Sequence, residues 1–325
     1  MANVSSATVS RCFNSPDRVV EATRERILQI VDEMEYTPNF GGRALASNRS
    51  NTVGAIIPTM ENAIFARGLQ AFQIMLAENN VTMLVASSGY DQERELQQIR
   101  SLVSQGADGL LLIGHARPEK TYEFLHRRQI PYVLTWNYHA DSSSYKVGFD
   151  NRRAATRLAQ HVLKLGHERI AFITAHTEFN DRALDRLNGV RDAMRSSGIT
   201  IDNLEIVRTT YSLKSGGDAF QFLMARTPRP TVVMCGNDVL ATGAIGRANE
   251  MGISIPDEVS VTGFDDIDLA EVIQPKLTTV HVPHRRMGAS AARLLLDILD
   301  DKADCQSVEL ETEIIIRESL GPALP

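Results

Sequence analysis

From Thr52 onward, short apolar runs alternate with longer stretches in which apolar residues recur at helical spacing. The short runs are apolar at consecutive positions, which is typical of strands covered on both faces of a sheet. We expect strands at residues 52–57, 81–86, 109–113, 132–135, 169–173, 205–208, 231–235 and 259–264. The helical patterns between them cover residues 65–78, 93–104, 122–128, 153–165, 182–197, 216–224 and 239–251. This alternation predicts an α/β fold with parallel sheets, and the strands fit two three-layer lobes.

The first 50 residues have a different pattern. Apolar residues at helical spacing predict one helix within residues 17–36 and a shorter one within 5–13, separated by a turn at Pro16. Residues 37–51 contain a proline, two glycines and several polar residues, which is typical of a linker between domains. Two short helices therefore precede the linker and the α/β region.

Polar or aromatic residues follow many of the expected strands. In parallel sheets wrapped by helices, ligands bind beyond the carboxyl ends of the strands, so these residues predict a binding site at one edge. The alternative is that they are only turn-forming residues, because Asn, Asp and Ser favour strand exits regardless of function. The residues concerned are Thr59, Ser87, Ser88, Trp136, Asp150, Asn237, Asp238, Asp265 and Asp266.

The composition is that of a folded globular protein, with 43% hydrophobic and 23% charged residues. The net charge is −6, so any contact with nucleic acid must come from a local patch. No apolar run approaches the roughly 20 residues of a membrane-spanning helix, and charged residues occur at Arg11, Asp17 and Arg18 where a signal peptide would be apolar. The three cysteines are widely spaced and suit neither paired disulfides nor a metal site. We expect a cytoplasmic protein with no structural metal and no membrane partner.

The sequence does not favour an enzyme. It contains no G-x-S-x-G nucleophile elbow, no phosphate-cradling G-x-x-x-x-G-K and no histidine and cysteine spacing of a metal centre. The histidines at positions 115, 139, 167 and 176 are scattered, and unpaired histidines are common without a catalytic role. We therefore expect no catalytic residues and no cofactor.

Two segments near the N-terminus, VSSATVSRCFN at 4–14 and YTPN at 36–39, resemble the DNA-binding headpiece of the lactose-repressor family of bacterial regulators. Further short sequence motifs of that family follow in the same order, among them LGH at 165–167, IPDEV at 255–259, GFDD at 263–266 and IRES at 316–319. The resemblance covers essentially the whole chain. It implies a sequence-specific transcriptional repressor with a helix-turn-helix headpiece and two lobes of the periplasmic-binding-protein type.

The resemblance also implies domain boundaries. The family's headpiece begins with another helix, and this chain starts about where that helix should end, so we expect a partial headpiece at residues 1–36. The hinge is expected at 37–51 and the effector-binding domain at 52–325. Within that domain, the N-lobe should comprise about 52–149 and 283–308, and the C-lobe about 150–282 and 309–321.

The segment 5–13 resembles the family's recognition helix, whose exposed residues face base edges in the major groove of operator DNA. Arg11 can donate two hydrogen bonds to guanine or one to phosphate, whereas the alternative is a small helix with a solvated arginine. The hinge position that inserts a leucine into the minor groove corresponds to Leu45. The implied DNA-binding residues are Ser6, Ala7, Thr8, Ser10, Arg11, Asn39 and Leu45.

Between the lobes, the resemblance implies an effector pocket formed by Ile64, Phe65, Trp136, Asp150, Asn180, Arg182, Arg186, Tyr211, Asn237 and Asp265. Aromatic faces pack on the C–H faces of a sugar ring, and Asp, Asn and Arg side chains satisfy its hydroxyls. The two aspartates favour a neutral sugar or glycoside. The two arginines could instead pair with the carboxylate of a sugar acid, although Arg186 could also simply connect two loops.

Two further expectations concern function and assembly. A sugar-binding receptor without a DNA function would share the two-lobed fold, but the headpiece motif at residues 4–14 favours the regulator. Family members pair side by side, and the segment 316–325 has two prolines and no leucine heptads, so we expect a homodimer. The candidates for the dimer contact are the segment 106–111 and the helix at 93–104, with Leu96, Ile99 and Val103 at helical spacing, and the alternative is that these apolar residues only cover the sheet.

Overall fold

The structure is a computed structural model, and it describes residues 3–14, 16–34, 49–61, 63–140 and 144–323. The predicted hinge residues Asn39 and Leu45 lie outside the described residues. The N-terminal region has helix α1 (Ser6–Asn14), a 3-10 turn η1 (Pro16–Arg18) and helix α2 (Glu21–Glu33). Cys12 of α1 and Ile27 of α2 are buried, which gives this region a small core.

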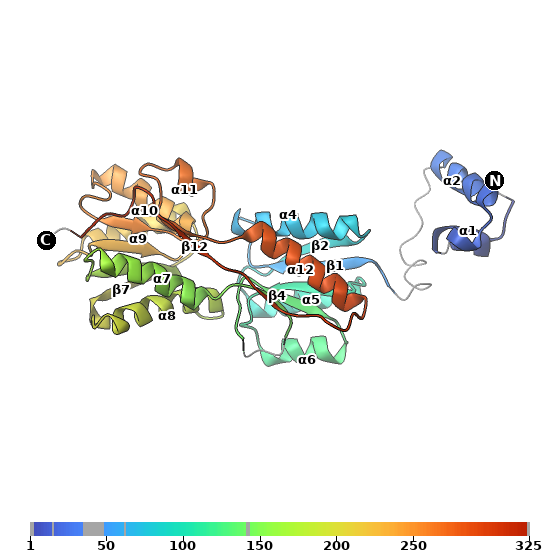
Figure 1. Ribbon diagram of the computed structural model, residues 1–325, viewed down its shortest axis with the longest axis horizontal. Coiled ribbons are helices and arrows are strands. Elements are labelled where there is room, and N and C mark those ends of the chain that lie inside the picture. Colours follow the sequence, from blue (N-terminus) through green and yellow to red (C-terminus); the bar gives the residue numbers. More distant parts are fainter. Residues whose placement is uncertain (1–2, 15, 35–48, 62, 141–143, 324–325) are drawn as a thin grey trace.

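The N-lobe contains a parallel six-stranded sheet with the order β11-β5-β4-β3-β1-β2. Its strands are β1 (Thr52–Ile57), β2 (Thr82–Ser87), β3 (Gly109–Ile113), β4 (Tyr132–Thr135), β5 (Lys146–Gly148) and β11 (Val308–Glu309). Helices α4 (Ala63–Glu78) and α12 (His284–Leu299) lie side by side over one face, and α5 (Gln92–Ser104) and α6 (Glu119–Arg127) cover the other (Figure 1). Successive residues of β1 point to opposite faces of the sheet, and because helices cover both faces, every residue of this strand is buried.

The C-lobe contains a parallel four-stranded sheet with the order β7-β6-β8-β9. Its strands are β6 (Ile170–Ala175), β7 (Leu204–Thr209), β8 (Val232–Cys235) and β9 (Ser260–Thr262). Helices α7 (Asn151–Lys164) and α8 (Asp181–Ser196) pack together over one face, and α9 (Leu213–Met224) and α10 (Asp238–Met251) over the other. Short elements η2 (Ile201–Asn203) and α11 (Leu269–Val272) complete the lobe.

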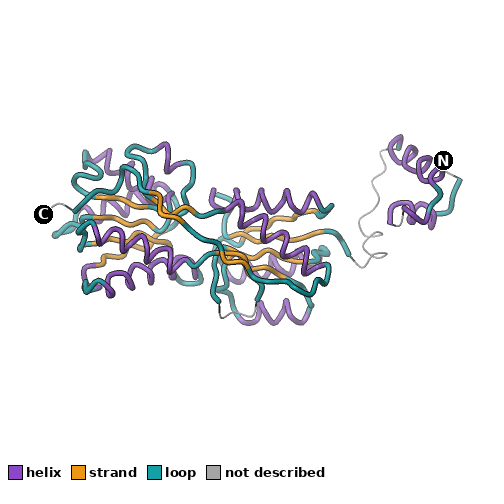
Figure 2. The backbone as a smooth tube through the Cα atoms, viewed as in Figure 1, coloured by secondary structure: helices purple, strands orange, loops and turns teal. Residues whose placement is uncertain are grey.

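The chain crosses between the lobes three times (Figures 1 and 2). The first crossing follows β5, the second follows β10 (Thr279–His281) into α12, and the third joins β11 to β12 (Glu313–Ile315). Strands β10 and β12 pair antiparallel, with Val280 opposite Ile314, so the second and third crossings run beside each other. The N-lobe therefore contains both early and late parts of the chain.

This architecture confirms the predicted fold class, including both three-layer lobes. The four strands that the sequence pattern did not predict, β5, β10, β11 and β12, are two or three residues long. The proposed dimer contact on helix 93–104 is wrong for its main apolar residues. Both Leu96 and Ile99 are buried within the protomer, and Ile99 belongs to one core cluster with Ile56 of β1 and Leu110 of β3, so it covers the sheet instead.

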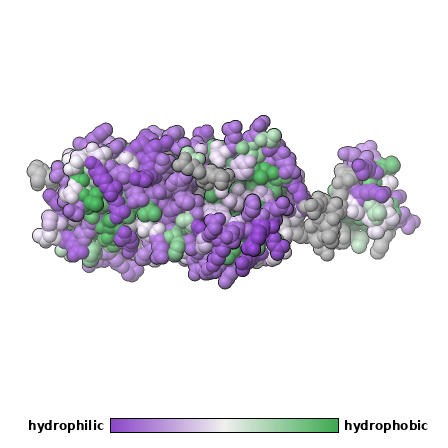
Figure 3. Space-filling view, turned by 90° about the horizontal axis from the view of Figure 1, so that it is seen from below, coloured by the Kyte–Doolittle hydropathy of each residue, from purple (hydrophilic) through white to green (hydrophobic). Residues whose placement is uncertain are grey.

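The surface seen in Figure 3 is mostly hydrophilic, with apolar groups in small areas over each lobe, as is usual for a folded protein. No helix of the described chain has the length and apolar character that crossing a membrane requires.

Candidate functional site

A narrow pocket lies between the lobes at the carboxyl ends of the strands, and we call it the interlobe pocket. Its cavity volume is about 10 Å³. The N-lobe contributes residues that follow β1, β2 and β4, and the C-lobe residues that follow β6, β7 and β8. The lining residues are Ile64, Phe65, Tyr90, Trp136, Asn180, Arg182, Arg186, Tyr211 and Asn237. The structure thus brings eight of the ten predicted effector residues into one pocket.

Two aromatic pairs form the walls. The rings of Phe65 and Trp136 have centroids 5.4 Å apart, and those of Tyr90 and Tyr211 have centroids 6.0 Å apart. Tyr90 was not predicted. It comes two residues after Ser88, at a strand exit that the pattern had marked, so the aromatic residue in that turn was the available signal.

The guanidinium of Arg186 is fixed by hydrogen bonds and a ring contact within the C-lobe. It donates to Asn151 Oδ1 at 2.8 Å, to the Gly236 carbonyl oxygen at 2.6 Å and to Asp265 Oδ1 at 3.2 Å. It also stacks on the ring of Phe264, 3.7 Å from the centroid. These contacts match the alternative interpretation of Arg186 as a residue that connects loops, and they also fix the position of Asp265.

Arg182 has a carboxylate partner as well. Its Nη1 donates to Asp181 Oδ1 at 2.6 Å, and Asp181 Oδ2 lies 2.7 Å from Nδ1 of His115 in the N-lobe. Burial raises the pKa of Asp181, but the charges and hydrogen bonds of Arg182 and His115 outweigh this effect and hold the pKa below its usual value. Asp181 is therefore ionised, and the two charges balance.

Three buried polar atoms have no hydrogen-bond partner among the described residues, two on residues that line the interlobe pocket and one on Asp265, which lies behind the lining. They are Nε1 of Trp136, Nδ2 of Asn237 and Oδ2 of Asp265. Asn237 caps helix α10 by accepting from the Leu240 amide at 3.0 Å through Oδ1, which leaves Nδ2 as the free donor. A buried polar group without a partner costs roughly 1–3 kcal/mol, so the pocket is suited to a ligand that supplies both donors and acceptors.

The backbone is strained around the interlobe pocket. Tyr90, Trp136 and Asp265 have φ angles of 62°, 63° and 105°, and Phe179, beside Asn180, has a φ of 59°. Such left-handed conformations are uncommon for aromatic residues and are typical of binding sites, where the surrounding structure fixes them.

Burial raises the pKa of three further groups at the site. It raises the pKa of Asp265 to about 6, although the nearby Arg186 opposes the shift. It also raises the pKa of both Tyr90 and Tyr211, so their hydroxyls remain protonated at neutral pH.

Two predicted residues do not line the pocket. Asp150 caps helix α7, because its Oδ1 accepts a hydrogen bond from the Arg153 amide at 2.8 Å. A side chain used as an N-cap turns back to the first turn of its own helix. The expectation that polar residues after a strand line the binding site is therefore wrong for Asp150. Asp265 lies behind Arg186 and is fully buried.

The predicted DNA-contacting residues lie on α1. Ser6, Ala7, Ser10 and Arg11 are exposed, and Thr8 is half-buried with its Oγ1 3.0 Å from Ser5 Oγ. Within the described residues, no group of histidine, cysteine and acidic side chains is arranged to hold a metal ion.

Comparisons with known proteins identify both regions. The family model of bacterial regulatory proteins of the lacI family matches residues 1–39, and that of the periplasmic binding protein-like domain matches residues 159–320. The chain is 31% identical over 323 residues to the HTH-type transcriptional repressor PurR of Vibrio vulnificus, covering 98% of this chain and 96% of the relative.

Solved structures of transcriptional regulators have the same fold as this chain. A Lacl family transcriptional regulator from Silicibacter pomeroyi superposes with a TM-score of 0.89 at 28% identity, covering 98% of this chain and 97% of that one. A complex of the transcriptional regulator CelR with cellobiose superposes with a TM-score of 0.72 at 28% identity, again covering 98% and 97%.

Proposed function

Because this chain belongs to the lacI family of bacterial regulatory proteins and is a DNA-binding transcriptional repressor, not an enzyme, we propose that a neutral sugar or glycoside in the interlobe pocket controls its affinity for operator DNA. The observation that carries this choice of ligand is the charge balance of the pocket. Arg182 is paired with Asp181, and Arg186 with Asp265, so the charge of each arginine is already balanced by a carboxylate of the protein, and a ligand carboxylate would add a further negative charge. A sugar acid would therefore leave a buried charge uncompensated.

The hydrogen-bonding groups of the pocket support the same ligand class. Trp136 Nε1 and Asn237 Nδ2 are free donors, and Asp265 Oδ2 is a free acceptor. A hydroxyl both donates and accepts, so a polyhydroxylated ring can satisfy the two donors that line the pocket, and its C–H faces can pack on the surrounding aromatic rings. We propose that a ligand hydroxyl also reaches Asp265 behind the lining. The CelR structure is a complex with cellobiose, and a sugar ligand on the same fold is consistent with this proposal.

The headpiece supports the accompanying proposal for DNA. Exposed Ser6, Ala7, Ser10 and Arg11 occupy one short helix and would face base edges in the major groove, with Thr8 near the phosphates. Asn39 and Leu45 remain proposals for the minor-groove contact. A repressor acts where its operator is, so we place the protein in the cytoplasm.

We further propose that two copies form a homodimer, because a symmetric pair places two α1 helices on the half-sites of an operator. The sheet-edge strands β2 and β7 lie on the same side, since Tyr90 after β2 contacts Tyr211 after β7. Exposed apolar residues occur there in both lobes, with Val85 on β2 and Leu213 at the start of α9. Sedimentation of the Val85→Asp and Leu213→Asp double variant should give a monomer if this side forms the contact.

The ligand is tested by a thermal-shift screen against neutral sugars, glycosides and sugar acids, because a ligand that binds only the folded state raises its stability. A neutral compound should raise the melting temperature of the parent and of Tyr145→Ala, in which an exposed tyrosine outside the pocket is removed. The shift should disappear in Tyr211→Ala. The same compound should then change the affinity for operator DNA at fixed salt.

Two results would contradict the proposal. Stabilisation by sugar acids alone would show that an arginine does receive a ligand carboxylate. A shift that survives in Tyr211→Ala would place the ligand outside the interlobe pocket.

A further inference from the structure

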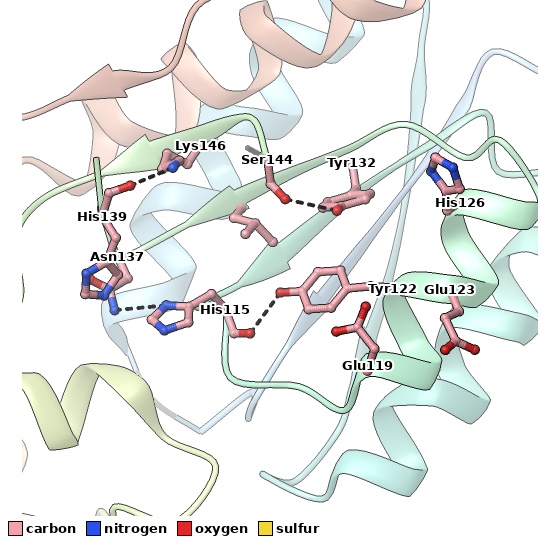
Figure 4. Close-up of a pocket in the computed structure, with 12 residues that line it drawn as sticks. His115, Glu119, Tyr122, Glu123, His126, Tyr132, Asn137, His139, Ser144 and Lys146 are labelled. Carbon is pink, nitrogen blue, oxygen red and sulfur yellow. Dashed lines mark hydrogen bonds between the residues drawn. The ribbon is translucent and has the colours of Figure 1, made fainter. Parts of the chain in front are cut away.

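A larger cavity lies elsewhere, in the N-lobe beside helix α6 (Figure 4). Its volume is about 720 Å³, and none of its lining residues lines the interlobe pocket. On one face of the sheet, α12 covers β4 and β5. On the opposite face, side chains of the same two strands line the cavity, and α6 forms one side of it.

Two tyrosines form much of its wall. Tyr122 donates its hydroxyl to the His115 carbonyl oxygen at 2.8 Å and accepts from Arg117 Nη1 at 3.0 Å. The hydroxyl of Tyr132 lies 3.1 Å from Ser144 Oγ. The two ring centroids are 5.9 Å apart (Figure 4). Because both hydroxyls already have partners in the protein, the rings present mainly aromatic surface to a ligand.

Two carboxylates flank this aromatic surface. Glu119 and Glu123 are four residues apart on α6, so they lie on the same face of the helix, where like charges repel. Both line the cavity, and in the part of the chain that the structure describes neither carboxylate has a hydrogen bond or an ion pair. Their positions therefore favour a positively charged partner.

The basic groups nearby are already engaged. Arg117 is paired with Glu95, and Lys120 with Glu93. Lys146 donates its ammonium to the His139 carbonyl oxygen at 2.6 Å. The ring nitrogens of His115 and His139 face Asp181 and Asp185 of α8. Lys146 keeps its charge, because its partner is a neutral carbonyl oxygen, so the lining carries the two glutamate carboxylates and one ammonium.

We propose that this cavity is a second ligand site, for a small organic cation that carries an ammonium group on an apolar body. The ammonium would bind Glu119 and Glu123, and the body would pack on the rings of Tyr122 and Tyr132, where an ammonium is also attracted to an aromatic face. A neutral or anionic ligand of the same shape would leave both carboxylates without a partner. This site is independent of the proposed sugar effector.

Three ligands of one shape test the charge requirement: phenethylamine, 2-phenylethanol and phenylacetate. In NMR titrations of the full chain, only the amine should bind saturably, and it should shift the ring signals of His115, His126 and His139. Trp136 is the only tryptophan and lies in the interlobe pocket, so its fluorescence should stay constant. A change in Trp136 fluorescence, or equal binding of amine and alcohol, would overturn the proposal.

The carboxylates are tested with matched variants. The double variant Glu119→Gln and Glu123→Gln should weaken amine binding about tenfold, as expected for the loss of two exposed ion pairs. The control carries Glu78→Gln and Glu168→Gln, which remove the same charge from exposed positions outside the cavity, and it should bind within about twofold of the parent. Equal losses in both would mean that the amine is attracted only by the negative net charge, and the proposal would fail.

Discussion

Arg186 and Asp265 form a fully buried pair in which one carboxylate oxygen receives the guanidinium at 3.2 Å and the other has no partner among the described residues. The pairing fixes the orientation of Asp265, burial opposes its ionisation, and we propose that its second oxygen accepts a hydrogen bond from a ligand hydroxyl. This arrangement ties the stability of the C-lobe and the binding of the effector to one carboxyl group, and it leads to the first two predictions.

In the absence of effector, Asp265 should make the protein less stable as the pH rises. Its pKa is about 6 in the folded protein against an ordinary 3.8, so between these values the folded state binds more protons than the unfolded state. The free energy of unfolding then falls with rising pH, by at most about 3 kcal/mol from this group.

Urea denaturation of the parent and of Asp265→Asn between pH 4 and 7.5 checks this. Burial also raises the pKa of Asp238, which acts in the same direction, so only the difference between the two proteins reports Asp265. Parallel pH profiles for parent and variant would contradict the prediction.

Effector binding should release protons near pH 6. A ligand hydroxyl donated to Asp265 Oδ2 stabilises the ionised carboxylate and lowers its pKa in the complex. Affinity should therefore rise between pH 5 and 7. Calorimetry in two buffers of different ionisation enthalpy measures the proton release directly, and proton uptake would show that the carboxyl binds in its protonated form.

Gly114 should be essential for lobe contact. It has a φ of 70°, and a Cβ at this position would overlap Arg182 Nη1 and Asp181 Oδ1 of the C-lobe. We expect Gly114→Ala to weaken effector binding by tenfold or more, because it displaces Arg182 from the pocket, and to cost about 1 kcal/mol or more in stability from backbone strain.

The matched control is Gly198→Ala. Gly198 has a similar φ of 73°, but no atom lies within 4 Å of the place that a Cβ would take, so the variant has the same backbone strain without the overlap. Its effector affinity should match the parent. Equal effector affinities in the two variants would show that the contact between Gly114 and Arg182 has no role in binding.

Arg11→Ala should reduce operator affinity by about 1–3 kcal/mol and relax base preference at one position of each half-site, if Arg11 donates to guanine. Gel-shift titrations at fixed salt on operator and random DNA distinguish the possibilities. A loss of the same size on both DNAs would assign Arg11 to a phosphate instead.

The strand-exit pattern located the edge at which the interlobe pocket lies, because parallel topology brings all carboxyl ends to one edge of each sheet. Of the residues that it marked, only Trp136 and Asn237 line the pocket, and the other predicted lining residues came from the resemblance to the lactose-repressor family. The pattern failed at Asp150 because an aspartate at a strand exit is also a good helix cap, and only the three-dimensional structure shows which role its oxygen fills. Tyr90 was missed because a tyrosine in a turn has no distinctive spacing. The pairing of Arg186 with Asp265 could not be predicted, since the two residues are 79 positions apart.

The cavity beside α6 has a different origin. It depends on where α6 ends relative to β4 and β5, and packing offsets of this kind leave no pattern in a single sequence. The short strands β10 and β12 were missed for a related reason: their pairing, such as Thr279 with Ile315, joins distant segments that each lack strand periodicity.

The return of the chain to the N-lobe determines the order in which the lobes can mature during synthesis. All four strands of the C-lobe sheet fall within residues 170–262, so one continuous stretch of nascent chain completes it. The N-lobe begins first, at Thr52, but its α4 layer lacks α12 until residues 284–299 have left the ribosome. The two helices approach so closely that a Cβ on Gly288 would overlap the Gly68 carbonyl oxygen, and nothing earlier in the described chain takes this place. Both lobes are therefore completed late, because α12 completes the N-lobe and Ser319 then exchanges hydrogen bonds with Val261 of the C-lobe.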